Sequence, residues 1–159
     1  MMRIGFSKDI HRIVEGRPFI LAGIKIDTNF GLLGHSDADV VLHAVAESIL
    51  GALSLKDLGT YFPDTSDEYK NYDSSKIVSR VVEMMEERKY HVSNIDILVE
   101  LEFIKLANYI DKMVENVAKL LHIGVDQVAI KAATNEKLDS VGKGEACIAY
   151  SSVLLESDE

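Results

Sequence analysis

The chain has 159 residues, of which 47% are hydrophobic, so it can form a packed core and is not disordered throughout. We expect residues 1–159 to form a single domain. Its 17 basic and 26 acidic side chains give a formal net charge of −9. This charge argues against nucleic acid or an anionic membrane surface as a partner. An anionic substrate would therefore need local positive charge, from a metal ion or from backbone amides.

The single cysteine, Cys147, excludes an intramolecular disulfide, and its strand-like surroundings predict a position in the core. The N-terminal residues contain no apolar stretch typical of a signal peptide. No segment approaches the ~18 consecutive apolar residues that a membrane span requires. We therefore expect a cytoplasmic protein, or one of the plastid stroma if a transit peptide has been removed.

Alternation of residue types over 3–11 predicts a first strand with one small, polar face, and residues 19–26 predict a second strand. The glycine-rich segment 29–39 reads as a loop. Over 39–53 the apolar residues recur every four positions, which predicts an amphipathic helix with a polar stripe beside the apolar one. A further loop follows through residues 59–65.

In the second half, Asp73 or Ser74 is expected to cap a helix that runs to about residue 89. Strands are predicted over 95–103, 128–132 and 145–154, with a helix over 109–121 that ends by Gly124. This order of elements favours an α+β, two-layer sandwich with a mixed β-sheet covered on one face by helices. If the other sheet face is apolar, it needs a partner subunit.

Three residues of the N-terminal quarter could form a metal site. Asp9 and His11 point to the same side of a strand, and His43 lies on the polar stripe of the 39–53 helix. Singly, each is typical of a solvated surface. Together, a carboxylate and two imidazoles suit zinc with one coordination position left open, and they also suit non-haem iron. Sequence spacing does not distinguish these metals.

A second candidate site follows the strand 128–132. Backbone amides, Thr134 and Lys143 could bind phosphate there, and Glu136 could bind Mg²⁺. The alternative is a polar turn without a ligand. The segments 57–59 and 62–65 could likewise be a binding loop or only turns.

Taken together, these motifs resemble one family. They are Asp9-x-His11, the block Gly31–Ala44 that contains His-Ser-Asp-x-Asp-x-x-x-His, Asp57-Leu58-Gly59, Phe62-Pro63-Asp64-Thr65 and Thr134-x-Glu136-Lys137-Leu138. In this order and at these spacings, the chain resembles the 2-C-methyl-D-erythritol 2,4-cyclodiphosphate synthases over essentially its whole length.

The resemblance implies a lyase of the non-mevalonate pathway of isoprene biosynthesis. Such an enzyme converts 4-diphosphocytidyl-2-C-methyl-D-erythritol 2-phosphate to 2-C-methyl-D-erythritol 2,4-cyclodiphosphate and releases CMP. The 2-phosphate of the substrate attacks the β-phosphate. The resemblance also implies a homotrimer with active sites between adjacent subunits, and a small cytidine-diphosphate substrate as the partner.

The resemblance further implies roles for individual residues. Asp9, His11 and His43 would bind Zn²⁺, Glu136 would bind Mg²⁺ or Mn²⁺ with the substrate diphosphate, and His35 and Thr134 would stabilise the transition state. The residues implied to contact substrate are Asp9, His11, His35, Ser36, Asp57, Leu58, Gly59, Phe62, Pro63, Asp64, Thr65, Ser66, Leu101, Lys105, Leu106, Ala107, Ala133, Thr134, Asn135, Glu136, Ser140 and Lys143. Of these, residues 57–59 would bind the erythritol. The segments 101–107 and 133–136 would bind the cytidine diphosphate.

Two other functions fit the same residues. One is a metal-dependent phosphohydrolase that uses water as the nucleophile and forms an open-chain product. The other is a non-catalytic trimeric nucleotide-binding module, which would bind its nucleotide without turnover and without the metal triad.

Overall fold

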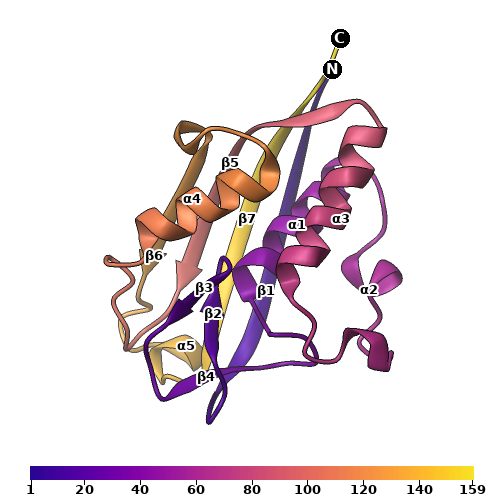
Figure 1. Ribbon diagram of the computed structural model, residues 1–159. Coiled ribbons are helices and arrows are strands. Elements are labelled where there is room, and N and C mark those ends of the chain that lie inside the picture. Colours follow the sequence, from indigo (N-terminus) through magenta and orange to yellow (C-terminus); the bar gives the residue numbers. More distant parts are fainter.

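The computed structural model describes all 159 residues and is organised around a five-stranded mixed sheet (Figure 1). Its order is β4-β1-β7-β5-β6, and only the β5–β6 pair is parallel. The strands are β1 (Met2–Glu15), β4 (Phe30–Leu33), β5 (Tyr90–Glu100), β6 (Val128–Ala133) and β7 (Ala146–Ser157). The mixed sheet predicted from the sequence is confirmed.

Three long helices cover one face of this sheet, as Figure 1 shows, which confirms the two-layer α+β fold. They are α1 (Val40–Ala52), α3 (Ser74–Glu87) and α4 (Ile110–Leu121). The short helices are α2 (Leu58–Tyr61), η1 (Asp67–Tyr69), η2 (Val125–Gln127) and α5 (Asp139–Gly142). None of the helices has the length and apolar character needed to cross a lipid bilayer.

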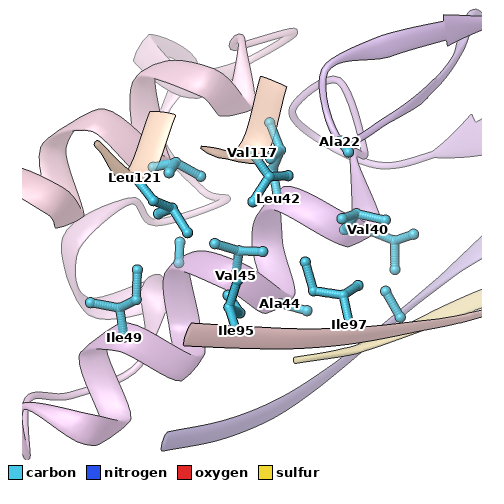
Figure 2. Close-up of a cluster of buried hydrophobic side chains, with 14 of the residues drawn as sticks. Ala22, Val40, Leu42, Ala44, Val45, Ile49, Ile95, Ile97, Val117 and Leu121 are labelled. Atoms are coloured by element: carbon cyan, nitrogen blue, oxygen red, sulfur yellow. The ribbon is translucent and has the colours of Figure 1, made fainter. Parts of the chain in front are cut away.

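The core lies between the helices and the sheet (Figure 2). Apolar side chains of α1 pack between strand β5 and helix α4, and each of them is at most 2% exposed. They are Leu42, Val45 and Ile49 on α1, Ile95 and Ile97 on β5, and Val117 and Leu121 on α4. Burial of this apolar surface is the main stabilising term of the fold. It also fixes α1, the helix that bears His43, over the sheet.

Helix α1 lies unusually close to β1 at Gly5. A Cβ atom at this position would lie 1.8 Å from the carbonyl oxygen of Ser48 on α1, so only glycine fits. Beside it, the buried hydroxyls of Ser48 and Ser151 are hydrogen-bonded at 2.8 Å. This close approach sets the distance between His43 on α1 and the β1 residues that face it.

The opposite sheet face is largely uncovered by this chain. Ile4, Phe6 and Ile10 of β1 are 81%, 65% and 47% exposed, and the Phe6 ring stacks on Tyr150 of β7 at 6.2 Å between centroids. Only the short helix α5 reaches this face, where it buries one end of β7. The apolar second face considered in the sequence analysis is therefore present.

The predicted strand over 19–26 is instead a hairpin of β2 (Phe19–Leu21) and β3 (Ile24–Ile26). Its two turn residues, Ala22 and Gly23, have φ values of 54° and 77°. Positive φ at both positions is typical of a tight hairpin turn. The carboxylate of Asp39 accepts hydrogen bonds from both turn amides, at 2.9 and 2.7 Å, and so stabilises a turn that the local sequence did not indicate.

Other differences from the predictions lie in segments that were read as loops. Strand β4 falls within the predicted loop 29–39, where it pairs with the far end of β1. Helices α2, η1 and α5 also lie in predicted loops. Helix α4 ends at Leu121 as predicted, but the residue that caps it is His122, in a left-handed conformation with φ of 60°, rather than Gly124. Asp73, one of the two predicted caps, caps α3, and Asp39 caps α1.

Candidate metal centre and active site

Asp9, His11 and His43 converge on one point between β1 and α1. The Oδ2 atom of Asp9 lies 3.0 Å from Nε2 of His11 and 3.1 Å from Nδ1 of His43. One potential ligand atom from each residue lies within 4.8 Å of the others. The alternation of β1 places Asp9 and His11 on the same side, and α1 supplies the third group.

The two ring nitrogens of His11 face different neighbours. Its Nδ1 lies 2.7 Å from the carbonyl oxygen of Leu33, which can only accept, so Nδ1 carries the proton. In the neutral ring, Nε2 then presents a lone pair toward Asp9. A carboxylate and two imidazoles with a free nitrogen are a donor set that fits a divalent cation.

The triad also determines its own charge state. Burial alone would raise the pKa of Asp9, but hydrogen bonds and charge from His11 and His43 lower that pKa to about 2. Burial by itself lowers the pKa of His11, but its hydrogen bond and attraction to Asp9 outweigh burial and raise that pKa. The Asp9 carboxylate is therefore ionised at neutral pH and is available to a cation.

The triad lies in a cavity of about 400 Å³. Besides the triad, the predicted substrate-contacting residues that line it are His35, Ser36, Leu58, Gly59, Phe62 and Asp64. The cavity is also lined by Gly34, Glu47, Tyr69 and Ile77, which the sequence analysis did not name as site residues. Glu47 could have been found, because it follows His43 by one turn on the same polar stripe of α1.

Turn chemistry shapes the segment that borders this cavity. Asp57 caps α2 by accepting hydrogen bonds from the amide and the hydroxyl of Thr60, at 3.2 and 2.9 Å. Ser66 caps η1, and its carbonyl oxygen lies 2.7 Å from Nε2 of His35. Asp57, Pro63, Thr65 and Ser66 are not among the residues that line the cavity.

The remaining predicted site residues form a second group at the ends of β5 and β6. The amide of Leu101 donates to the carbonyl of Ala133 at 3.0 Å. The carboxylate of Glu102 accepts from the amides of Asn135 and Lys137, at 2.9 and 2.8 Å. These bonds join the segments 101–107 and 133–136, so the two segments are neighbours in the fold.

In this second group Thr134 and Glu136 are exposed, and Glu136 and Lys137 have positive φ values of 53° and 62°. Ser140 lies in α5, and Lys143 caps the end of that helix. No residue of 101–107 or 133–143 lines the cavity of the metal triad. Within one chain, the predicted site is therefore divided between two places.

A model of the YgbB family matches residues 2–156. The chain belongs to the YgbB family. A 2-C-methyl-D-erythritol 2,4-cyclodiphosphate synthase of Brachyspira hyodysenteriae is 49% identical over 154 residues, which cover 97% of this chain and 98% of that protein. The Chlorobaculum tepidum protein of the same name is 44% identical over 156 residues, covering 98% of this chain and 99% of its own.

Solved structures agree with this membership of the YgbB family. The CDP complex of IspF from Plasmodium falciparum has a TM-score of 0.88 at 31% identity, covering 99% of this chain and 97% of that one. The bifunctional IspDF from Campylobacter jejuni has a TM-score of 0.95 at 35% identity. This chain is covered to 99% in that comparison but spans only 42% of the bifunctional protein.

Proposed function

We propose that this chain is a 2-C-methyl-D-erythritol 2,4-cyclodiphosphate synthase, which converts 4-diphosphocytidyl-2-C-methyl-D-erythritol 2-phosphate to the cyclic 2,4-diphosphate and CMP. The observation that carries the proposal is the agreement with synthases along almost the full length of both chains. The cavity that contains the triad and His35 supports the proposal. By its chemistry the enzyme is a phosphorus–oxygen lyase.

The proposed reaction needs no nucleophile from the protein. An oxygen of the substrate's 2-phosphate attacks the β-phosphorus, the bond from that phosphorus to the bridging oxygen breaks, and CMP leaves with the electron pair. The protein's tasks are to hold the two phosphates in line and to neutralise charge on the equatorial oxygens. For an acidic chain, this calls for cations and directed hydrogen bonds.

We infer that Asp9, His11 and His43 hold Zn²⁺, which when bound supplies positive charge to the substrate phosphates. His35 is proposed as a catalytic residue at the edge of the same cavity. The Ser66 carbonyl fixes its Nε2 proton, so that a protonated ring would donate from Nδ1 to the reacting phosphate. Leu58 and Gly59 would contact the erythritol, together with Asp57 at the start of α2.

The cytidine diphosphate is proposed to bind at the second group of residues. A relative has been solved as a CDP complex, which supports a ligand of this class. Residues 101–107, including Lys105, and 133–136 would contact the nucleotide. Thr134 would donate to the reacting phosphates, and Glu136 would bind Mg²⁺ or Mn²⁺ with the diphosphate.

The two groups must meet around one substrate, and we propose that they do so across subunits of a homotrimer. Within a single chain, neither nucleotide segment lines the triad cavity. The exposed apolar residues of β1 give each subunit a sheet face that is suited to burial against another copy. One subunit would supply the metal triad, and its neighbour the segment that contains Thr134.

Phosphorus NMR of the purified protein with the diphosphocytidyl substrate, Zn²⁺ and Mg²⁺ tests this function directly. We expect CMP and a coupled pair of cyclic diphosphate signals, both abolished by a chelator. CMP with an open-chain phosphorylated product would instead indicate the phosphohydrolase. Tight binding of CDP without turnover, unaffected by the chelator, would indicate the nucleotide-binding module.

A further inference from the structure

The second nitrogen of His43 has a buried partner, Ser74, that the proposed reaction does not use. While Nδ1 faces Asp9, Nε2 lies 2.8 Å from the hydroxyl oxygen of Ser74 and 3.1 Å from that of Ser36. Ser74 is the first residue of α3 and is fully buried, although it lies 31 residues from His43. Helix α3, which carries none of the triad residues, therefore contacts His43 at the ring nitrogen that faces away from Asp9.

The direction of the hydrogen bond between Ser74 and His43 follows from a third residue. The carboxylate of Asp37 accepts a short hydrogen bond from the Ser74 hydroxyl and a second bond, at 3.0 Å, from the Ser74 amide. An ionised carboxylate can only accept, so the hydroxyl proton of Ser74 points to Asp37. The oxygen of Ser74 then has only lone pairs for His43, and Nε2 must be the donor.

The surroundings keep Asp37 and Ser36 in place for this arrangement. Asp37 also accepts the amide of Asp39, at 3.1 Å, and its own amide donates to the carbonyl of Tyr72, at 3.0 Å. The hydroxyl of Ser36 accepts the amide of Ala38 at 3.2 Å and makes the longer of the two contacts with Nε2. Because Ser74 is excluded from water, no solvent molecule replaces its oxygen as the acceptor.

We propose that Ser74, oriented by Asp37, is a positioning residue that holds the Nε2 proton of His43 and so presents the Nδ1 lone pair to a divalent cation. The ring of a metal-bound histidine is generally fixed in this way, by an acceptor at its other nitrogen. Here the carboxylate acts through a serine that begins a different helix. The inference rests on the proposed metal site but concerns residues outside the set of ligands.

The test compares Zn²⁺ affinity in three variants by competition with a chromophoric chelator. Ser74→Ala removes the acceptor. Asp37→Asn leaves the Ser74 hydroxyl in place but keeps only one acceptor oxygen, so it must lose either the bond from the Ser74 amide or the bonds from the Ser74 hydroxyl and the Asp39 amide, and it orients Ser74 less strongly. We expect both variants to bind Zn²⁺ on the order of 10- to 100-fold more weakly. Ser75→Ala, the neighbouring serine on α3, is the matched control and should bind as the wild type does.

A second readout separates this role from a merely structural one. In the Zn²⁺-loaded wild type labelled with ¹⁵N-histidine, the Nε2 proton of His43 should give a hydrogen-bonded, slowly exchanging signal. In Ser74→Ala this proton should exchange faster, and in Ser74→Thr, which keeps a hydroxyl, the signal should return. If Ser74→Ala does not fold, Asp37→Asn alone decides the question.

Unchanged Zn²⁺ affinity in both variants, or an equal loss in Ser75→Ala, would overturn the inference. So would weaker binding with an unaltered Nε2 signal, because the serine would then act only on the fold. A wild type that binds Zn²⁺ and releases CMP keeps the proposed function even if the inference fails. A wild type that binds no Zn²⁺ overturns the metal site and the inference together.

Discussion

Two aspartates of this chain illustrate how neighbours decide the chemistry of a residue. Asp9 is surrounded by two imidazoles, and these outweigh burial and lower its pKa to about 2. Asp39 is completely buried, and burial raises its pKa to about 6 even though its carboxylate accepts the amides of Gly23 and Leu42. The same side chain is therefore a ready cation ligand at one position and a structural acceptor at the other.

The raised pKa of Asp39 predicts that the stability of the folded protein falls as the pH rises. Because the folded pKa of about 6 exceeds the ordinary aspartate pKa of 3.8, the contribution of Asp39 to stability is fully present below pH 3.8 and is lost as the pH rises through 6. Relative to Asp39→Asn, the metal-free wild type should lose about 2 kcal/mol between pH 4 and pH 7. Denaturant unfolding of both proteins measures this difference, and a difference independent of pH would contradict it.

Removal of a triad residue should abolish turnover without unfolding the chain. Asp9→Asn and His43→Ala each delete a proposed ligand, so we expect a larger loss of Zn²⁺ affinity than the ~10- to 100-fold typical of an outer partner. CMP release should fall below detection in the same assay. His91→Ala is the matched control, since His91 is an exposed histidine paired only with Asp158. Full activity of either triad variant would exclude the zinc assignment.

At the scale of elements, the site depends on how closely α1 approaches β1. Each of these elements carries part of the triad, and their spacing is set where Gly5 faces the backbone of Ser48. The long apolar stripe of α1 alone would not fix this distance, because side chains can repack by fractions of an ångström. A contact between backbone atoms cannot adjust in this way.

Two glycines of these elements make a matched test. Gly5→Ala should destabilise the protein by about 3 kcal/mol and weaken Zn²⁺ binding, because α1 must move away from β1. Gly51→Ala, also near the end of α1, meets nothing within 4 Å and should stabilise the protein by about 0.5 kcal/mol. Chemical denaturation with parallel Zn²⁺ titration checks both. Equal stability of the two variants would show that the contact between Gly5 and Ser48 does not set the distance between α1 and β1.

At the scale of the whole molecule, the sheet has one face buried by helices and another that this chain leaves open. Ile4 and Phe6 expose most of their surface there, which is costly for an isolated subunit in water. The predicted site is also divided into two groups of residues that do not meet within one chain. Both observations are explained if the active unit is an assembly of identical chains.

The trimer proposal predicts a mass of three chains in sedimentation equilibrium at micromolar concentration. Phe6→Glu should shift the protein to monomers and abolish CMP release, because a charge buried in an apolar interface is strongly unfavourable. Its secondary structure should persist, since the side chain is 65% exposed in the single chain. Ser79→Glu, which adds the same charge on the exposed side of α3, should remain trimeric. A monomeric and fully active wild type would refute intersubunit sites.

Much of this architecture was predictable because it depends on local periodicity. The alternation of β1 places Asp9 beside His11, the polar stripe of α1 contains His43, and Asp73, one of the two predicted caps, caps α3. The linear spacing of the motifs indicated the family, and the family model confirms it. These features follow from residues that are close together in the chain.

The remaining features were decided only by the tertiary structure. The β2–β3 turn is held by Asp39, 17 and 16 residues away, and His43 is contacted by Ser74, 31 residues away. Such bonds carry no periodic signal, because they form only when helices and strands have packed and excluded water from between them. The sequence by itself therefore determined the three long helices, most of the long strands and the candidate ligands, but not β4, the β2–β3 hairpin or the short helices. Packing decided which side chain orients each ligand, and it left the predicted substrate site in two separate parts.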